Sequence, residues 1–188
     1  MKTKVVRVLG LALASLLSMA GPSAEATKLP AAVALKQQIP ELEVSVVANK
    51  AKYKRRDRIR LDVKLTNTDG LRDVFVYGLL EFGHGGSFAL YRRDSKGREV
   101  PTRFIDEGLS EPPKADERSA FVKLRPDHFL GTSYRSSIYL LHLEKPGRYY
   151  IWLEYQSPIL KSDVDVSPFW GAENGIIKSN VISIEVLR

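Results

Sequence analysis

Residues 58–66 (RIRLDVKLT) alternate strictly between polar and apolar side chains. The apolar positions are Ile59, Leu61, Val63 and Leu65. A period of two is typical of a half-buried β-strand, whereas an amphipathic helix repeats its apolar residues every three or four positions. A shorter alternation of the same kind runs through residues 42–46. The pattern predicts a chain that folds as strands, each with one face turned to a core.

Apolar runs separated by turn residues continue along the rest of the chain. The run at 74–82 is apolar on both faces, which is typical of a central strand. Residues 94–97 (DSKG) predict a hairpin turn, and residues 67–70 (NTDG) a turn in which Asp-Gly can take positive φ. No convincing helix pattern is present, so we predict an all-β, antiparallel sandwich of about seven to nine strands. The further strands are expected at residues 88–91, 99–100, 120–124, 138–141, 148–155 and 180–186.

The first 26 residues have the layout of a secretory signal peptide. A basic start precedes the apolar run 8–20, and a small-residue site ends at Ala26. A membrane anchor is the alternative, but this run is shorter than the roughly 20 residues needed to cross a bilayer. We therefore predict a signal peptide at 1–26, no integral membrane span after its cleavage, and a periplasmic or extracellular protein.

Residues 27–40 are bounded by prolines and carry no strand pattern, so they are interpreted as a linker before a domain at 41–188. The chain has no cysteine, which excludes disulfides, thiolate metal sites and a cysteine nucleophile. Both methionines lie in the leader, which also removes the usual soft ligands for Cu(I). The domain must be held by its apolar core alone.

The segment 143–149 (LEKPGRY) leads directly into an apolar strand pattern. It resembles the turn before the penultimate strand of immunoglobulin-like and fibronectin type III-like domains, where a tyrosine corner is built. The resemblance implies that Leu143, Gly147 and Tyr149 build this corner. Gly147 would permit the turn, the Tyr149 ring would be buried against the sheet edge, and its hydroxyl would bond to an upstream backbone group. Ile151 stands where antibody domains have a cysteine, so the antibody subclass is excluded.

Two further segments carry a resemblance. Residues 65–67 together with 88–100 resemble the front half of bacterial sandwich domains, including a proteinase-inhibitor group, and residues 179–186 resemble the last strand of exported sandwich domains. The resemblance implies a bacterial exported immunoglobulin-like β-sandwich. It leaves the activity open, because such folds host many unrelated roles.

Two groups of side chains are candidates for binding. Phe169 and Trp170 lie in a predicted loop, where they would either stack on a sugar or partner, or be buried as a cap on the sandwich. Arg55 and Arg56 lie in the basic segment 50–60, which would either attract an anion or serve as the solvated edge of a strand. The chain as a whole carries a net charge of +7.

No catalytic site, metal site or cofactor is predicted. The glycine-rich segment 83–87 is interpreted as a strand connection, because no G-x-S-x-G elbow accompanies it. The three histidines lack zinc-ligand spacing, and the acidic positions near 163–174 are interpreted as a solvated loop rather than a calcium site. Paired carboxylates for glycoside hydrolysis remain a minor alternative. The residues concerned are His84, His128, His142, Asp106, Glu107, Asp163, Asp165, Glu173 and Asn174.

These observations favour an exported, non-catalytic interaction domain that presents loops to a protein or an anionic glycan of the cell envelope. Nucleic acid is not expected as a partner of an exported protein. The alternative is a protease inhibitor, in which the loop 105–115, stiffened by Pro112 and Pro113, would enter an active-site cleft.

Overall fold

The computed structural model describes residues 40–83, 86–100, 114 and 116–188. The predicted signal peptide, His84, and all of the loop 105–115 except Lys114 lie outside the described residues, as does the linker apart from Pro40. In the part that is described, no helix is long and apolar enough to cross a membrane.

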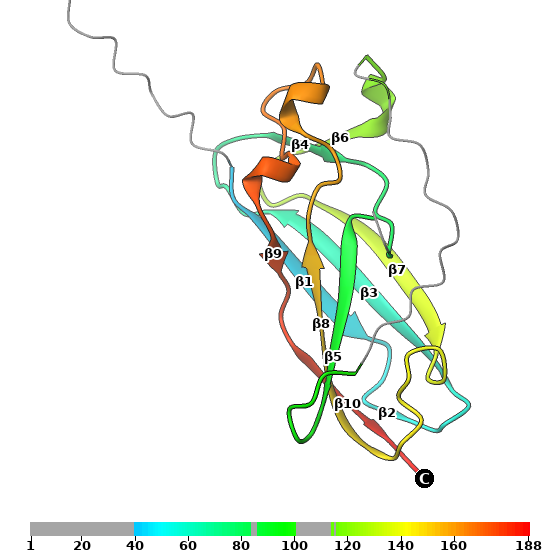
Figure 1. Cartoon of the computed structure of the whole chain (residues 1–188). Coiled ribbons are helices and arrows are strands. Elements are labelled where there is room, and N and C mark those ends of the chain that lie inside the picture. The colour runs from blue at the N-terminus through cyan, green and yellow to red at the C-terminus, as the bar shows by residue number, and fades with distance from the viewer. Residues whose placement is uncertain (1–39, 84–85, 101–113, 115) are drawn as a thin grey trace, which may run out of the picture. The chain divides into compact units, whose positions relative to one another are not determined.

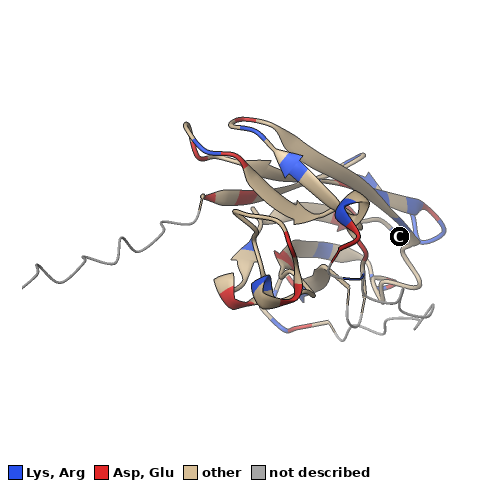
Figure 2. Cartoon of the chain, turned by 90° about the horizontal axis from the view of Figure 1, so that it is seen from above, with Lys and Arg blue, Asp and Glu red and all other residues tan. Residues whose placement is uncertain are grey.

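The strands form two main sheets, which lie as two layers (Figures 1 and 2). Neighbouring strands are antiparallel, except that β10 and β2 pair in parallel. A separate antiparallel pair, sheet C, joins β4 and β6.

Sheet A has the order β1 (Leu42–Ala48), β3 (Arg58–Asn67), β7 (Phe129–Ser137). Sheet B has the order β2 (Lys52–Tyr53), β10 (Ile182–Val186), β8 (Gly147–Tyr155), β5 (Phe88–Asp94), with β9 (Ile177–Lys178) also on β8. Sheet C consists of β4 (Val74–Tyr77) and β6 (Phe121–Leu124).

Among the described residues, the helical elements are three short 3-10 turns. They are η1 (Arg118–Ala120), η2 (Lys161–Asp163) and η3 (Ala172–Asn174).

The core lies between the inner faces of sheets A and B. In β3 the alternation predicted from the sequence is realised, because its four apolar side chains are all at most 1% exposed. The facing side chains from sheet B include Phe88, Ile151 and Leu153, which are fully buried. The prediction of an all-β, antiparallel immunoglobulin-like β-sandwich is confirmed.

Asn180 joins the two sheets at one edge. Its side-chain Nδ2 donates to the carbonyl oxygen of Val46 at 3.0 Å, and its Oδ1 accepts from the Val46 amide at 2.8 Å. Val46 lies in β1, the edge strand of sheet A, while Asn180 directly precedes β10 of sheet B. One amide side chain thus satisfies both backbone groups of an edge residue that has no strand neighbour on that side.

The prediction of a central strand at 74–82 is wrong. The strand β4 ends at Tyr77, and its ladder partner is β6 in the two-stranded sheet C. On its other side a single parallel bridge joins Phe75 to Phe169. Val76 packs into the main core, whereas Tyr77 belongs to a second apolar cluster with Phe121 and Phe169. Because one apolar cluster lies on each side of β4, the strand is apolar on both faces. A central strand of a sheet gives the same sequence pattern.

The strand predicted at 138–141 is also wrong, and the strand before it was missed. Residues 138–142 form a tight turn, in which the Leu143 amide donates to the carbonyl oxygen of Ile138 at 3.0 Å. The strand is β7, whose inner face holds Leu130, Thr132 and Tyr134, all only partly buried. An edge strand with such a mixed inner face gives no apolar alternation to find.

The turn into β8 contains the residues that were predicted to form a tyrosine corner. Leu143 is fully buried, Gly147 has a φ of +150°, and Tyr149 is 6% exposed. The Tyr149 hydroxyl donates to the carbonyl oxygen of Lys145 at 2.8 Å. Burial raises the pKa of Tyr149, and the nearby Asp94 and Glu144 raise it further. The hydroxyl therefore stays protonated and continues to donate.

Candidate binding groove

The outward face of sheet B carries a cluster of aromatic rings. Tyr91 of β5 and Trp152 of β8 are opposite each other in the strand ladder, and their rings stack with centroids 5.5 Å apart and planes at 9°. Tyr150 lies two positions before Trp152 on the same face. Rings on the solvent side of a sheet are not needed for the core, so this face is a candidate for binding.

Two cations flank Trp152. The Arg93 guanidinium lies 5.0 Å from the Trp152 ring centroid, and the Lys178 ammonium lies 4.8 Å from it. With these neighbours Trp152 is only 5% exposed, whereas Tyr91 keeps 37% of its surface exposed. Tyr91 is therefore the ring that a ligand would reach, and Trp152 is the rigid support behind it.

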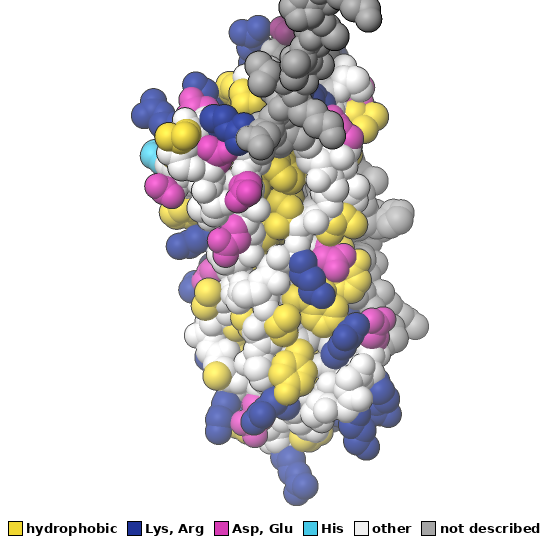
Figure 3. All heavy atoms as spheres, turned by 90° about the vertical axis from the view of Figure 1, so that its left-hand side faces the viewer, with side chains coloured by type: hydrophobic (Ala, Val, Ile, Leu, Met, Phe, Trp, Pro, Cys, Tyr) yellow, Lys and Arg dark blue, Asp and Glu magenta, His cyan; other side chains and the backbone are white. Residues whose placement is uncertain are grey.

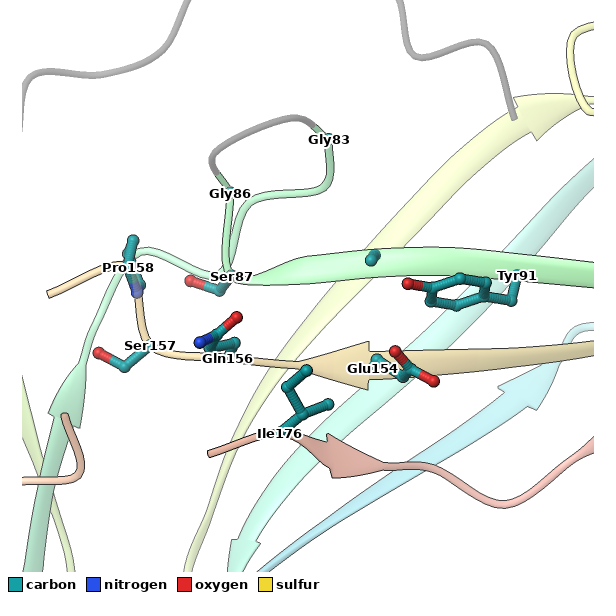
Figure 4. A pocket seen from close by; sticks show the side chains of 10 residues that line it. Gly83, Gly86, Ser87, Tyr91, Glu154, Gln156, Ser157, Pro158 and Ile176 are labelled. Atoms are coloured by element: carbon teal, nitrogen blue, oxygen red, sulfur yellow. The ribbon is translucent and has the colours of Figure 1, made fainter. Parts of the chain in front are cut away.

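A groove of about 420 Å³ begins at Tyr91 and extends past the end of β8 (Figure 4). Its size lies within the range of about 300–1,000 Å³ that is usual for ligand pockets. Figure 4 shows Tyr91 and Glu154 on neighbouring strands, with Gln156 and Ile176 farther along the groove. The lining residues are Gly83, Gly86, Ser87, Ala89, Tyr91, Glu154, Gln156, Ser157, Pro158 and Ile176.

Glycine is required in the loop that borders the groove. A Cβ atom on Gly86 would lie 2.8 Å from the carbonyl oxygen of Glu81, closer than atoms tolerate, and Gly83 has a φ of +130°. The loop therefore turns back tightly onto β5. The described residues of the glycine-rich segment, Gly83, Gly86 and Ser87, thus lie directly before β5.

The polar groups of the groove fall into two kinds. Ser87 Oγ donates to the Leu79 carbonyl oxygen at 3.1 Å, and Ser157 Oγ donates to that of Ile159 at 3.1 Å. These hydroxyls stabilise the loops in which the two serines lie. Glu154 raises the pKa of Tyr91 through its charge and a hydrogen bond, after the larger effect of burial. Among the polar side chains of the groove, Glu154 and Gln156 are therefore the ones available to contact a ligand.

A second cavity, of about 550 Å³, opens beside Tyr149. Its lining includes Asp94 and Arg98, which already form an ion pair at 2.7 Å. Glu99, Glu144 and Lys145 also line this cavity, so most of its lining is charged. The first groove presents an exposed ring with an amide and a carboxylate, which makes it the better candidate for a ligand that stacks on an aromatic ring.

Phe169 is not available for binding, which corrects its place among the predicted binding residues. The ring is 1% exposed and packs edge-on against Phe121, with centroids 5.3 Å apart. Trp170 is partly buried and packs against the main core, and its amide donates to the Phe75 carbonyl oxygen at 2.9 Å. Phe169 thus covers the apolar side of sheet C, whereas Trp170 packs against the main core.

Arg55 and Arg56 are exposed, as predicted, at the tip of the turn between β2 and β3. They lie at the opposite end of sheet B from the groove: Tyr53 is aligned with Val186 and Gly147, whereas Tyr155, at the other end of β8, lies beside Phe88. The structure therefore does not bring them together with Tyr91 and Glu154.

The acidic positions considered for calcium are engaged in other contacts. Asp165 pairs with Arg118 at 3.1 Å, Glu173 accepts from the Lys161 amide at 3.1 Å, and Asn174 Oδ1 accepts from the Gly171 amide at 2.8 Å. Across the described ranges, no group of three or more His, Asp or Glu side chains could hold a metal ion.

The groove residues were missed in the sequence, although a signal for them was present. If Tyr149, Ile151 and Leu153 face the core, the intervening Tyr150, Trp152 and Glu154 must face outward. Two aromatic residues and a carboxylate on the outer side of one strand were enough to mark this face. The pairing with Tyr91 depends on strand register, which the sequence did not supply.

Comparison with protein-family models and with curated protein sequences finds no match. Among solved structures, the fold is similar to the CARDB domain of a Pyrococcus furiosus protein, solved in solution (12% identity over 80% of this chain and 97% of that chain, TM-score 0.38). A crystal structure of that domain in complex with di-metal ions matches with 12% identity over 80% and 90% of the two chains and a TM-score of 0.37.

The sporulation control protein Spo0M of Bacillus subtilis matches with 9% identity over 78% of this chain and 49% of that chain, and a TM-score of 0.40. At these scores the likeness carries no argument about function. The fold assignment rests on the strand pairing and core described above.

Proposed function

We propose that this protein is an exported, non-catalytic binding domain that holds a neutral oligosaccharide in the groove on the outward face of sheet B. The proposal rests on one observation above all. The exposed ring of Tyr91, supported from behind by Trp152, lies beside the Glu154 carboxylate at the mouth of a groove. The export part rests on the signal-peptide layout of residues 1–26.

The chemistry of the groove suits a saccharide. Sugar rings have an apolar face of C–H groups that can lie on an aromatic ring, and hydroxyls at their rim that donate to a carboxylate or an amide. Tyr91 supplies the ring, and Glu154 and Gln156 supply the acceptors. Glu154 and Lys178, which lie opposite each other in the strand ladder, bring opposite charges to this part of the face, so we take neutral saccharides as the partner class.

The non-catalytic part of the proposal has a positive basis. The two serines of the groove are held by backbone carbonyl groups of Leu79 and Ile159, which orient their hydroxyls away from a role as nucleophile. Glycoside hydrolysis uses two carboxyl groups, and among the described lining residues Glu154 alone carries one.

Titration calorimetry with maltohexaose, cellohexaose, chitohexaose and mannohexaose tests the proposal. We expect at least one of the four to bind. Replacing Tyr91 with alanine should weaken that binding at least about tenfold, because the stacking surface is lost. Glu154→Gln, which keeps the shape and removes the charge, should weaken it less.

Tyr150→Ala is the matched control. Tyr150 is exposed to the same fraction as Tyr91, 37%, and lies on the same face, but it does not line the groove. It should bind as the unchanged protein does. If none of the four sugars binds, or if the Tyr150 variant loses as much affinity as the Tyr91 variant, the proposal is wrong.

A further inference from the structure

The turn between β2 and β3 is built to expose its cations. Asp57 Oδ2 accepts from the Lys50 ammonium at 2.6 Å and from the Lys54 amide at 2.8 Å, and the Asp57 amide donates to the Lys54 carbonyl oxygen at 2.9 Å. The hydrogen bond from Lys50 is the main reason that the pKa of Asp57 lies below its ordinary value. The carboxylate thus stays charged and fixes the turn, with Arg55 and Arg56 at its tip.

Four cations of this turn and of the first position of β3 form no ion pair with the described residues. Lys50, Lys52 and Arg60 pair with Asp57, Glu185 and Asp62. Within the residues that the structure describes, no ion pair includes any of the other four, which are all exposed: Lys54, Arg55, Arg56 and Arg58. Figure 3 shows Lys and Arg side chains gathered at the same lower end where the C-terminus lies in Figure 1.

A second turn, after β7, lies against the first. The Ile138 amide donates to the Asp57 carbonyl oxygen at 3.2 Å, and Ser137 is aligned with Arg58 in the ladder. In this second turn Ile138 and Leu141 are buried in the core, while Tyr139 and Leu140 are 63% and 46% exposed.

The exposed pair is held in place rather than loose. The Leu140 amide donates to Ser137 Oγ at 3.1 Å, and the His142 amide donates to the Tyr139 carbonyl oxygen at 2.9 Å. The buried residues on both sides anchor the turn. A tyrosine and a leucine that face water next to unpaired cations form an apolar patch with a basic rim, which marks an interaction site.

We propose that this end of the domain, made of Lys54, Arg55, Arg56, Arg58, Tyr139 and Leu140 and called the basic end below, docks on an anionic lipid membrane surface. The cations lie near the lipid phosphates, and Tyr139 and Leu140 enter the interface between head groups and acyl chains. Tyrosine is suited to that layer because its ring is apolar and its hydroxyl is polar.

The combination of side chains favours a membrane over a soluble polyanion. A sulfated or carboxylated polysaccharide would need the cations alone, and it would leave the exposed leucine and tyrosine without a role. A lipid surface uses both, because the charges attract the domain and the apolar pair adds attraction that salt does not screen.

Vesicle co-sedimentation tests the proposal with the protein produced from its full chain and purified in its exported form. Vesicles of equal parts phosphatidylglycerol and phosphatidylcholine should bind it, and vesicles of phosphatidylcholine alone should not. The double variant Arg55→Glu/Arg56→Glu should bind the anionic vesicles at least about tenfold more weakly, since each lost cation near such a surface is worth about fivefold.

Vesicle binding at high salt measures the contribution of Tyr139 and Leu140. Tyr139→Ser/Leu140→Ser should lose the part of the binding that persists at high salt, while keeping the salt-sensitive part. Lys114→Glu/Arg125→Glu is the matched control, because it changes the net charge equally on two exposed residues, before η1 and after β6, that no ion pair among the described residues includes. This control should bind within about twofold of the unchanged protein. Thermal unfolding of each variant shows that it is folded.

Three outcomes would overturn the proposal. The first is equal binding to vesicles with and without phosphatidylglycerol. The second is an equal loss in the control variant, which would make the effect one of net charge. The third is binding to immobilised heparin without binding to anionic vesicles, which would favour a soluble polyanion instead. Oligosaccharide binding in the groove is a separate measurement, so either proposal can fail alone.

Discussion

At the scale of single residues, Asn180 carries the contact that joins the edge of sheet A to sheet B. Its amide satisfies both the N–H and the C=O of Val46, which is itself fully buried. Replacing it with alanine would leave two backbone groups without protein partners. We expect the free energy of unfolding to fall by about 1–3 kcal/mol, measured by urea denaturation.

Asn180→Asp is the control for that prediction. It keeps the acceptor for the Val46 amide but sets a carboxylate oxygen against the Val46 carbonyl oxygen, so it should also be less stable than the unchanged protein. An alanine variant as stable as the unchanged protein would mean that water replaces the amide at no cost.

Tyr155 makes a pH-dependent contribution to stability. Burial alone raises its pKa well above the ordinary value near 10, and its hydroxyl has no hydrogen-bond partner among the described residues. Below pH 10 the hydroxyl is protonated in both folded and unfolded chains, so the stability is fully present. Above pH 10 only the unfolded chain ionises, and this tyrosine costs the fold about 1.4 kcal/mol for each further pH unit.

Tyr155→Phe should therefore be at least as stable as the unchanged protein at pH 7 and should lose less stability between pH 10 and 11.5. Urea denaturation at a series of pH values measures both effects. An identical alkaline decline in the two proteins would show that Tyr155 ionises freely in the folded state.

At the scale of elements, sheet C depends on the aromatic cluster behind it. Phe169 packs on Phe121, and the Phe75 amide donates to the Pro168 carbonyl oxygen at 2.7 Å, so the segment before η3 lies along β4. Phe169→Ala should lower the free energy of unfolding by about 3–5 kcal/mol, and Phe169→Leu by less than about 2 kcal/mol. Chemical denaturation measures both, and a mild effect of the alanine variant would indicate an exposed ring.

The elements also show what the sequence could and could not supply. The strand β3 could be predicted because one of its faces is wholly apolar and the other wholly polar. The strand β7 could not, since its inner face is mixed, and the apolar residues that follow it anchor a turn. The apolar run 74–82 predicted a central strand wrongly. A strand that lies between two apolar clusters, as β4 does, buries both of its faces just as a strand inside a sheet does.

The candidate site, like the fold, could be predicted only in part from the sequence. The outward position of Trp152 follows from the alternation along β8, so it could have been read from the sequence. Its stacking with Tyr91 needs the register of β5 against β8, and the burial of Phe169 needs the position of sheet C. Contacts between segments far apart in the chain carry no local signal.

At the scale of the whole domain, the two proposed sites lie at opposite ends of sheet B. The basic end is near Gly147, where β8 starts, and the groove is near Tyr155, where it ends. At about 3.3 Å per residue, the separation along β8 is roughly 17 Å to Trp152, which lies opposite Tyr91, and roughly 26 Å to the end of the strand. A domain held to a surface by the basic end would keep the groove turned away from it.

The distance makes the two sites independent. Arg55→Glu/Arg56→Glu should leave the oligosaccharide affinity unchanged within about twofold, because the groove begins about two Debye lengths away at physiological ionic strength. Titration calorimetry on this variant checks it, and a large loss of sugar affinity would show that the two ends are coupled.

The most direct test of the central claim is where on the domain the saccharide binds. Backbone amide NMR spectra recorded during titration with each hexasaccharide should show the largest shifts at Gly86, Tyr91, Glu154 and Gln156. The amides of Arg55, Arg56 and Tyr139 should stay in place. Shifts centred on the basic end, or no shifts at the groove at saturating sugar, would contradict the assignment of the outward face of sheet B as the binding site.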